Sequence, residues 1–244
     1  MIIRDDYDHP DLPRIAEEFS RWLLEFGYPS CPGNIMINNS EWRRPLRGFR
    51  DMIWRWIRGT DEAAYLNLAI FYDAAPVAGD HTLLADAKQY LHERMGDNGS
   101  FFAYFARPTL NFDTPTGLLS SWFGERGGRH QLDVKKAGIF PLVHGVRSLA
   151  LENRMIKTNT LDRLWGLCDA KVLDRDFTTE LAAAFTAMQS LRLKAWIDGN
   201  GIQSDNVLRL DDFSKADRDL LRESLLTVKQ FKELITYHFR LTLF

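Results

Sequence analysis

The C-terminal part of the chain carries a regular apolar repeat that a helix can bury on one side. The residues of this repeat lie three or four positions apart, and they are Leu221, Leu225, Val228, Phe231, Ile235 and Phe239. One α-helical turn takes about 3.6 residues, so this spacing gathers these side chains on one face. The repeat predicts a long helix over about 215–243. Its apolar face needs other helices to cover it.

Further amphipathic segments before this helix supply those partners. We expect three more helices, over about 134–153, 161–170 and 177–197. Residues 158–160, TNT, are of the types that cap helix N-termini, and Ser214 followed by Asp217 resembles a capping arrangement for the last helix. Four antiparallel helices with short connections form a bundle. The C-terminal part is therefore predicted to be a helical bundle.

The N-terminal part combines a short strand with helices. Residues 1–5 resemble a strand that runs into a loop. The periodicity of apolar residues predicts helices over about 10–26, 45–59, 81–95 and 101–106, the last capped by Ser100. A long irregular stretch over residues 111–131 separates this part from the bundle. The whole chain is predicted to be α+β, mostly α.

The stretch Leu66–Asp80 stands out because its short apolar run ends on a carboxylate. Apolar and aromatic residues bounded by Pro76 and Gly79 are typical of a buried strand. A carboxylate at the end of such a strand costs free energy unless a metal, a cation or hydrogen-bond donors satisfy it. Asp73 is therefore a candidate site residue. The alternative is a strand end that simply meets water.

Two polar segments are candidates for binding. The loop Tyr28–Trp42 contains Asn34, Asn38 and Asn39, whose amides can contact a ligand, although the loop can also be a plain connection. The second segment has Asp133, Lys135 and Lys136 where the irregular stretch enters the bundle. Lysines there can bind phosphate, and the alternative is a charged helix start that complements the helix dipole.

Composition and motifs argue against several classes of function. A net charge of -2 gives no bulk attraction for nucleic acid or an anionic membrane. Cys31 and Cys168 lie far apart without metal-site spacing, which suits a reducing cytoplasm. No apolar run of about 18 residues predicts a membrane span, and the N-terminus lacks a signal pattern. The histidines are scattered, and His144 is predicted to be a satisfied histidine of the bundle.

Four separated motifs together resemble a known family. They are GYPSCPGNIMINNSEWR, NLAIFYDAAPVAGD, LDVKKAGIFPLVHGVRSLAL and TNTLDRL. In this order they resemble the last two parts of bacterial nucleotidyltransferases that carry CBS and cyclic-nucleotide-binding domains upstream. That family is similar to protein-PII uridylyltransferase and glutamine synthetase adenylyltransferase. The resemblance implies a partial nucleotidyltransferase α/β domain over residues 1–87 and a helical, substrate-binding domain over 88–244.

The resemblance also implies roles for individual residues. In the family, three carboxylates hold two divalent cations, Mg²⁺ or Mn²⁺, and Asp73 matches the third of them. Asp80 matches a recurrent Gly-Asp pair. Ala75 stands where the family often has a basic residue, which weakens a phosphate contact there. The Gly-Ser turn and the other two carboxylates would lie just before Met1.

Two hypotheses of function follow from the resemblance. In the first, the chain is a fragment of a cytoplasmic, metal-dependent nucleotidyltransferase in bacterial signalling. The intact enzyme would transfer a nucleotide from a nucleoside triphosphate to a protein acceptor, whereas this chain alone would bind Mg²⁺ weakly and be inactive. In the second, the chain is a non-catalytic protein-binding or dimerisation module. Neither hypothesis involves nucleic acid or a membrane, and both allow a homodimer.

Overall fold

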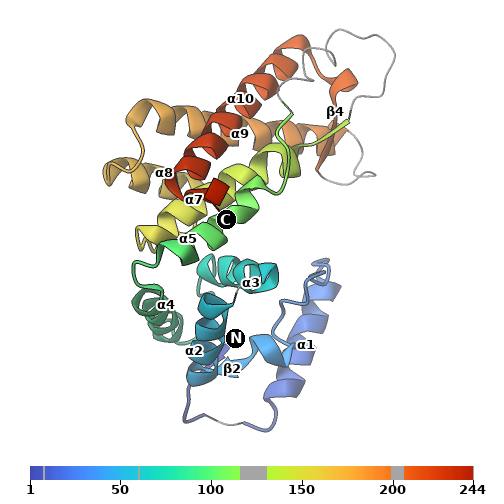
Figure 1. Ribbon diagram of the computed structural model, residues 1–244. Helices are drawn as coiled ribbons and strands as arrows, with labels where there is room; N and C mark the ends of the chain where they lie inside the picture. The colour runs from blue at the N-terminus through green and yellow to red at the C-terminus, as the bar shows by residue number, and fades with distance from the viewer. Residues whose placement is uncertain (8, 60, 116–130, 199–205, 244) are drawn as a thin grey trace. The chain divides into compact units, whose positions relative to one another are not determined.

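The structure is a computed structural model, and it consists of two compact units, Met1–Gly96 and Asp97–Phe244 (Figure 1). It describes residues 1–7, 9–59, 61–115, 131–198 and 206–243. Helices dominate both units, and each of the two sheets in the described residues has two strands. The prediction of an α+β, mostly α fold is confirmed. The expected division after residue 87 falls inside a helix of the first unit, Thr82–Met95.

In the first unit, two helices pack against a strongly amphipathic central helix, α2 (Leu46–Arg58). The helices of this unit are α1 (Leu12–Glu25), α2, α3 (Glu62–Tyr72) and α4 (Thr82–Met95). Strand β1 (Ile2–Ile3) pairs in parallel with β2 (Arg44–Pro45). The buried side of α2 packs against α3 and α4, with the rings of Trp56 and Phe71 6.2 Å apart. The N-terminal strand and the helices predicted over 10–26, 45–59 and 81–95 are thus confirmed.

The strand predicted in Leu66–Asp80 is wrong, because this segment is the helix α3 followed by a loop. The buried residues of α3 are adjacent pairs, and each pair follows the previous one after about one helical turn. They are Ala64, Tyr65, Leu68, Ala69, Phe71 and Tyr72. Asp61 caps the helix, since its Oδ1 accepts a hydrogen bond from the backbone N–H of Ala64 at 2.7 Å. A helix that is apolar on most of its surface has little amphipathic contrast, so its short apolar run resembles a buried strand.

The second unit is a helical bundle with a small sheet at one end. Its α-helices are α5 (Gly99–Ala106), α7 (Phe140–Glu152), α8 (Thr160–Asp169), α9 (Arg175–Asp198) and α10 (Lys215–His238). The helices α9 and α10 lie side by side, and α10 also packs against α7 (Figure 1). The predicted helices of the bundle are confirmed, but α10 ends at His238, before the expected 243. The short helix α5 is capped by Asn98 and not by Ser100.

A small sheet and a π-helical turn were not predicted at the start of the bundle. Strand β3 (Gln131–Asp133) pairs antiparallel with β4 (Val207–Arg209), which joins two segments distant in sequence. A π-helix over Lys135–Ile139 then leads directly into α7. π-helical turns occur mostly as single turns inside α-helices. Three-residue strands are too short for an alternating pattern to reveal them.

Capping and close packing fix the bundle helices. As predicted, Asn159 caps α8, accepting from the N–H of Leu161 at 2.9 Å, and Ser214 caps α10, accepting from that of Asp217 at 3.1 Å. Gly145 of α7 lies so close to α10 that a Cβ atom there would stand 2.6 Å from Cε1 of Phe231. Only a residue without a side chain allows this approach.

Candidate functional site

Asp73 lies at the C-terminal end of α3 and is partly exposed. Its backbone N–H donates to the carbonyl oxygen of Ala69 at 3.2 Å. The carbonyl groups at a helix C-terminus carry partial negative charge, so this position favours a cation beside the carboxylate. Among the described residues, however, no three His, Cys, Asp or Glu side chains come close enough to hold a metal ion. The donor set around Asp73 does not by itself fit a two-metal centre.

Asp80 lines a cavity of about 310 Å³ in the first unit. Apolar residues form most of its wall, and they include Phe49 of α2, Phe71 of α3 and, in the loop after α3, Ala75. Asp80 itself is engaged locally, since its Oδ1 accepts from the hydroxyl of Thr82 at 2.7 Å and from the N–H of the same residue at 3.0 Å. The hydroxyl bond is the main cause that lowers the pKa of Asp80. The carboxylate therefore holds the first residue of α4 by two hydrogen bonds, and Asp80 also lines the cavity.

The asparagine-rich loop uses its amides mainly to fix its own shape. Asn39 donates from Nδ2 to the carbonyl oxygen of Asn34 at 2.9 Å and accepts at Oδ1 from the N–H of Glu41 at 3.0 Å. Asn34 has a φ of 52°, a left-handed conformation that asparagine tolerates. Asn38 donates to Glu17 of α1 at 3.3 Å. Asn39 also lines a pocket of about 440 Å³, and binding by the loop stays a prediction.

At the entry to the bundle, Asp133 caps the π-helical turn. Its Oδ1 accepts a hydrogen bond from the N–H of Lys136 at 3.0 Å, and Nζ of Lys136 lies 3.8 Å from its Oδ2. This geometry matches the alternative of a charged helix start. Lys135 is exposed beside it, so phosphate binding by this pair stays a prediction.

Lys232 of α10 is a polar residue near this entry that sequence reasoning missed. Its ammonium group donates to the carbonyl oxygen of Phe112 at 2.6 Å and to the hydroxyl of Thr114 at 3.4 Å. Burial lowers the pKa of Lys232, and the charge of Asp113 opposes this shift. Its position in the sequence could have revealed it, because a lysine one turn after Val228 lies on the apolar face of α10.

His144 confirms the prediction of a satisfied bundle histidine. Its ring is buried, with Nε2 2.7 Å from the carbonyl oxygen of Phe105 and Nδ1 2.9 Å from Nη1 of Arg147. A guanidinium group can only donate, so Nδ1 accepts, and Nε2 carries the proton that it donates to Phe105. Both nitrogens of a neutral imidazole are thereby used. His144 is therefore a structural residue.

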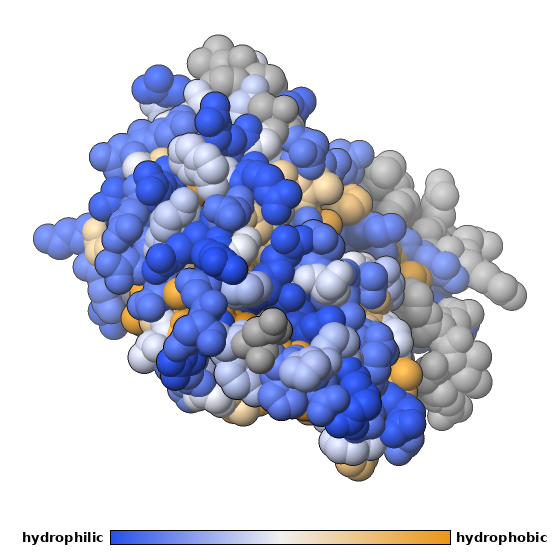
Figure 2. Space-filling view, turned by 90° about the horizontal axis from the view of Figure 1, so that it is seen from below, coloured by the Kyte–Doolittle hydropathy of each residue, from blue (hydrophilic) through white to orange (hydrophobic). Residues whose placement is uncertain are grey.

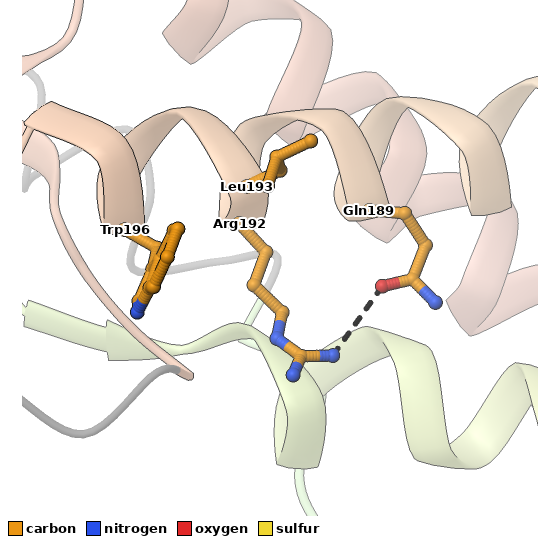
Figure 3. A pocket seen from close by; sticks show the side chains of 4 residues that line it. All are labelled: Gln189, Arg192, Leu193 and Trp196. Atoms are coloured by element: carbon orange, nitrogen blue, oxygen red, sulfur yellow. Dashed lines mark hydrogen bonds between the residues drawn. The ribbon is translucent and has the colours of Figure 1, made fainter. Parts of the chain in front are cut away.

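The second unit has a pocket of about 400 Å³ on α9. Its described lining consists of Gln189, Arg192, Leu193 and Trp196. Gln189, Arg192 and Trp196 project to the same side of α9, while Leu193 points away from it (Figure 3). Nη1 of Arg192 donates to Oε1 of Gln189 at 3.4 Å, and the Trp196 side chain is 51% exposed. The pocket thus combines a cation, an amide and an accessible aromatic ring.

The chain thus combines a helical unit that contains a parallel strand pair with a helical bundle. Comparison with known protein families assigns each of these units. A family profile described as "Putative nucleotidyltransferase substrate binding domain" matches residues 99–239, and one described as "Putative nucleotidyltransferase" matches residues 1–63. The first match covers more than half of the chain, so the protein belongs to this nucleotidyltransferase-like family. No curated protein and no solved structure matched the chain. Within the described ranges, no helix is both long and apolar enough to cross a bilayer.

Proposed function

We propose that the protein serves in metal-dependent transfer of a nucleotide from a nucleoside triphosphate to a protein acceptor. The observation that carries this proposal is the order of the family matches, each of which falls within one compact unit. Mg²⁺ or Mn²⁺ is the cofactor that such chemistry uses. By analogy with protein-PII uridylyltransferase, the acceptor would be a bacterial signalling protein. CBS and cyclic-nucleotide-binding domains upstream of this chain would regulate the transfer.

The pocket on α9 is our candidate for the nucleotide contact within the substrate-binding region. An exposed indole ring stacks on any nucleobase, and such stacking contributes about 1–3 kcal/mol per base. The guanidinium of Arg192 suits a phosphate, and the amide of Gln189 can both donate and accept at a base edge. These side chains lie on the same side of one rigid helix (Figure 3). Their chemistry therefore fits a nucleotide better than an apolar ligand.

Calorimetric titration with ATP and with UTP, each with Mg²⁺ or Mn²⁺, tests this assignment. The substitutions Trp196→Ala and Arg192→Ala should each weaken nucleotide binding by at least about five-fold, which corresponds to the loss of about 1 kcal/mol. Arg175→Ala, at the other end of α9, is the matched control and should leave binding unchanged. Wild-type-like binding by both pocket variants would refute the site.

Transfer itself is tested separately with labelled ATP or UTP and a protein acceptor. Two divalent cations need several carboxylate ligands, and Asp73 would supply one. We therefore expect weak Mg²⁺ binding and no labelled product from this chain alone. Labelled product from the isolated chain would contradict this expectation.

The second candidate is a non-catalytic protein-binding or dimerisation module. We expected this function to reveal itself as an exposed apolar patch on the outer face of the bundle. Leu193, Trp196 and Ile197 near the end of α9 are each at least half exposed, as such a patch requires. If the titrations detect no nucleotide, these residues become candidates for a protein contact.

A further inference from the structure

Helix α1 presents an apolar face to the surface instead of to the core of its unit. The exposed fractions are 44% for Ile15, 44% for Phe19, 48% for Trp22 and 78% for Phe26, the residue that caps the helix. The residues that α1 does bury are small, namely Ala16 and Ser20. Large aromatic side chains gathered on one exposed face mark an interaction site.

The apolar face of α1 extends along the whole helix with a regular spacing. Most of the face seen in Figure 2 is hydrophilic, with smaller hydrophobic areas between charged residues. On α1, by contrast, Leu12, Ile15, Phe19, Trp22 and Phe26 alternate at spacings of three and four residues. This alternation is that of the a and d positions of a coiled coil, which pack against a second helix. The spacing therefore indicates that the partner of this face is itself a helix.

A row of charges beside the apolar face shows which helix fits. Arg14, Glu18, Arg21 and Glu25 follow one another along the same edge of the face, with alternating sign. Within the helix, Nη1 of Arg14 lies 2.9 Å from Oε1 of Glu18, and Nε of Arg21 lies 3.8 Å from Oε1 of Glu25. These side chains are 37–64% exposed, so they remain accessible to a second helix.

We infer that α1 pairs in antiparallel orientation with α1 of a second copy of this chain. Antiparallel alignment reverses the row of charges, so every arginine meets a glutamate of the partner. Arg14 comes close to the partner's Glu25, and Arg21 to the partner's Glu18. In a parallel pair the two rows would lie on opposite sides of the apolar seam, so they could not pair with each other.

The apolar residues fit the same antiparallel register. Placing Ile15 opposite the partner's Phe26 also places Phe19 opposite the partner's Trp22. The complementary charges then differ in axial level by two residues, or about 3 Å, which arginine side chains span easily. Such a contact is isologous and closes as a two-fold dimer. It does not depend on the proposed nucleotide chemistry.

Light scattering after size exclusion, over micromolar to submillimolar concentrations of the whole chain, tests the pairing. The wild-type protein should be in concentration-dependent equilibrium with a dimer. Trp22→Glu places a charge in the apolar seam and should give a monomer. A wild-type protein that is monomeric throughout this range would overturn the proposal, as would a Trp22→Glu variant that still dimerises.

Charge exchange gives a sharper test that leaves the apolar face intact. One variant carries Arg14→Glu with Arg21→Glu, so its row is wholly acidic, and the other carries Glu18→Arg with Glu25→Arg, so its row is wholly basic. Each variant alone should dimerise at least about ten-fold more weakly than wild type, and an equimolar mixture should form a heterodimer. Unchanged dimerisation of either variant, or a mixture that stays monomeric, would contradict the antiparallel pair. Far-ultraviolet circular dichroism checks that both variants keep their helices.

Discussion

Replacing Gly145 by alanine tests the close contact between α7 and α10. The added Cβ would lie 2.6 Å from Cε1 of Phe231, 3.2 Å from its Cζ and 3.1 Å from Cγ1 of Ile235. Carbon atoms pack best at about 3.5–4.0 Å, so the ring would have to move by roughly 1 Å. Phe231 and Ile235 are fully buried. The two helices must therefore separate, or the ring must leave its preferred rotamer.

Two opposing effects set the size of the change. Overpacking a filled core costs about 1–3 kcal/mol, and the short contact places Gly145→Ala in the upper half of this range. Alanine in place of glycine within a helix returns about 1 kcal/mol. The expected net loss is therefore about 1–2 kcal/mol in the free energy of unfolding. For a unit of this size, this loss lowers Tm by about 2–8 °C.

Thermal and urea denaturation of paired variants provide the measurement. Gly166→Ala in α8 is the matched control, since its nearest neighbour, Sδ of Met155, lies at an ordinary 3.4 Å. This control should be neutral or gain up to about 1 kcal/mol. Adding Phe231→Leu should reduce the penalty of Gly145→Ala, and a double-mutant cycle measures this coupling. A Gly145→Ala protein as stable as wild type would refute the reasoning.

Two further predictions concern polar contacts of the bundle. Ser214→Ala removes the cap of α10 and should cost about 1 kcal/mol in urea denaturation, whereas Ser190→Ala, exposed on α9, should change stability by less than about 0.5 kcal/mol. The folded protein lowers the pKa of Lys232, so the unfolded chain binds this proton more tightly. The free energy of unfolding should then rise as the pH increases from the folded pKa toward the unfolded value of about 10.4, and Lys232→Met should lose this rise.

The sequence predicted the bundle well because its helices are amphipathic and capped. The apolar row from Leu221 to Phe239 and the caps at Asn159 and Ser214 are local signals, and local signals persist in the folded protein. The same logic located α1, α2 and α4. It failed for α3, where apolar residues on nearly all sides remove the contrast between helix and strand. The cap at Asp61, just before the apolar run, was the local signal that distinguishes them.

The candidate sites were harder to predict because they depend on contacts between distant segments. Lys232 reaches Phe112 across more than a hundred residues, and no local pattern encodes that contact. The capping role of Asp133 was foreseen as an alternative because it involves neighbours in sequence. The pocket on α9 escaped notice because Gln189, Arg192 and Trp196 form no known motif, although their spacing places them on one helical face.

The π-helical turn over Lys135–Ile139 sets an angle within the second unit. A π-helical turn contains about one residue more than an α-helical turn, and each residue of an α-helix advances the chain by about 100° around the axis. The extra residue therefore rotates the start of the helix about the axis of α7 by about a quarter of a revolution, compared with an uninterrupted α-helix. The direction in which β3 joins the helix changes by the same angle. That direction allows Gln131–Asp133 to pair with β4. The extra residue thus sets the orientation of Asp133 and of the sheet relative to the bundle.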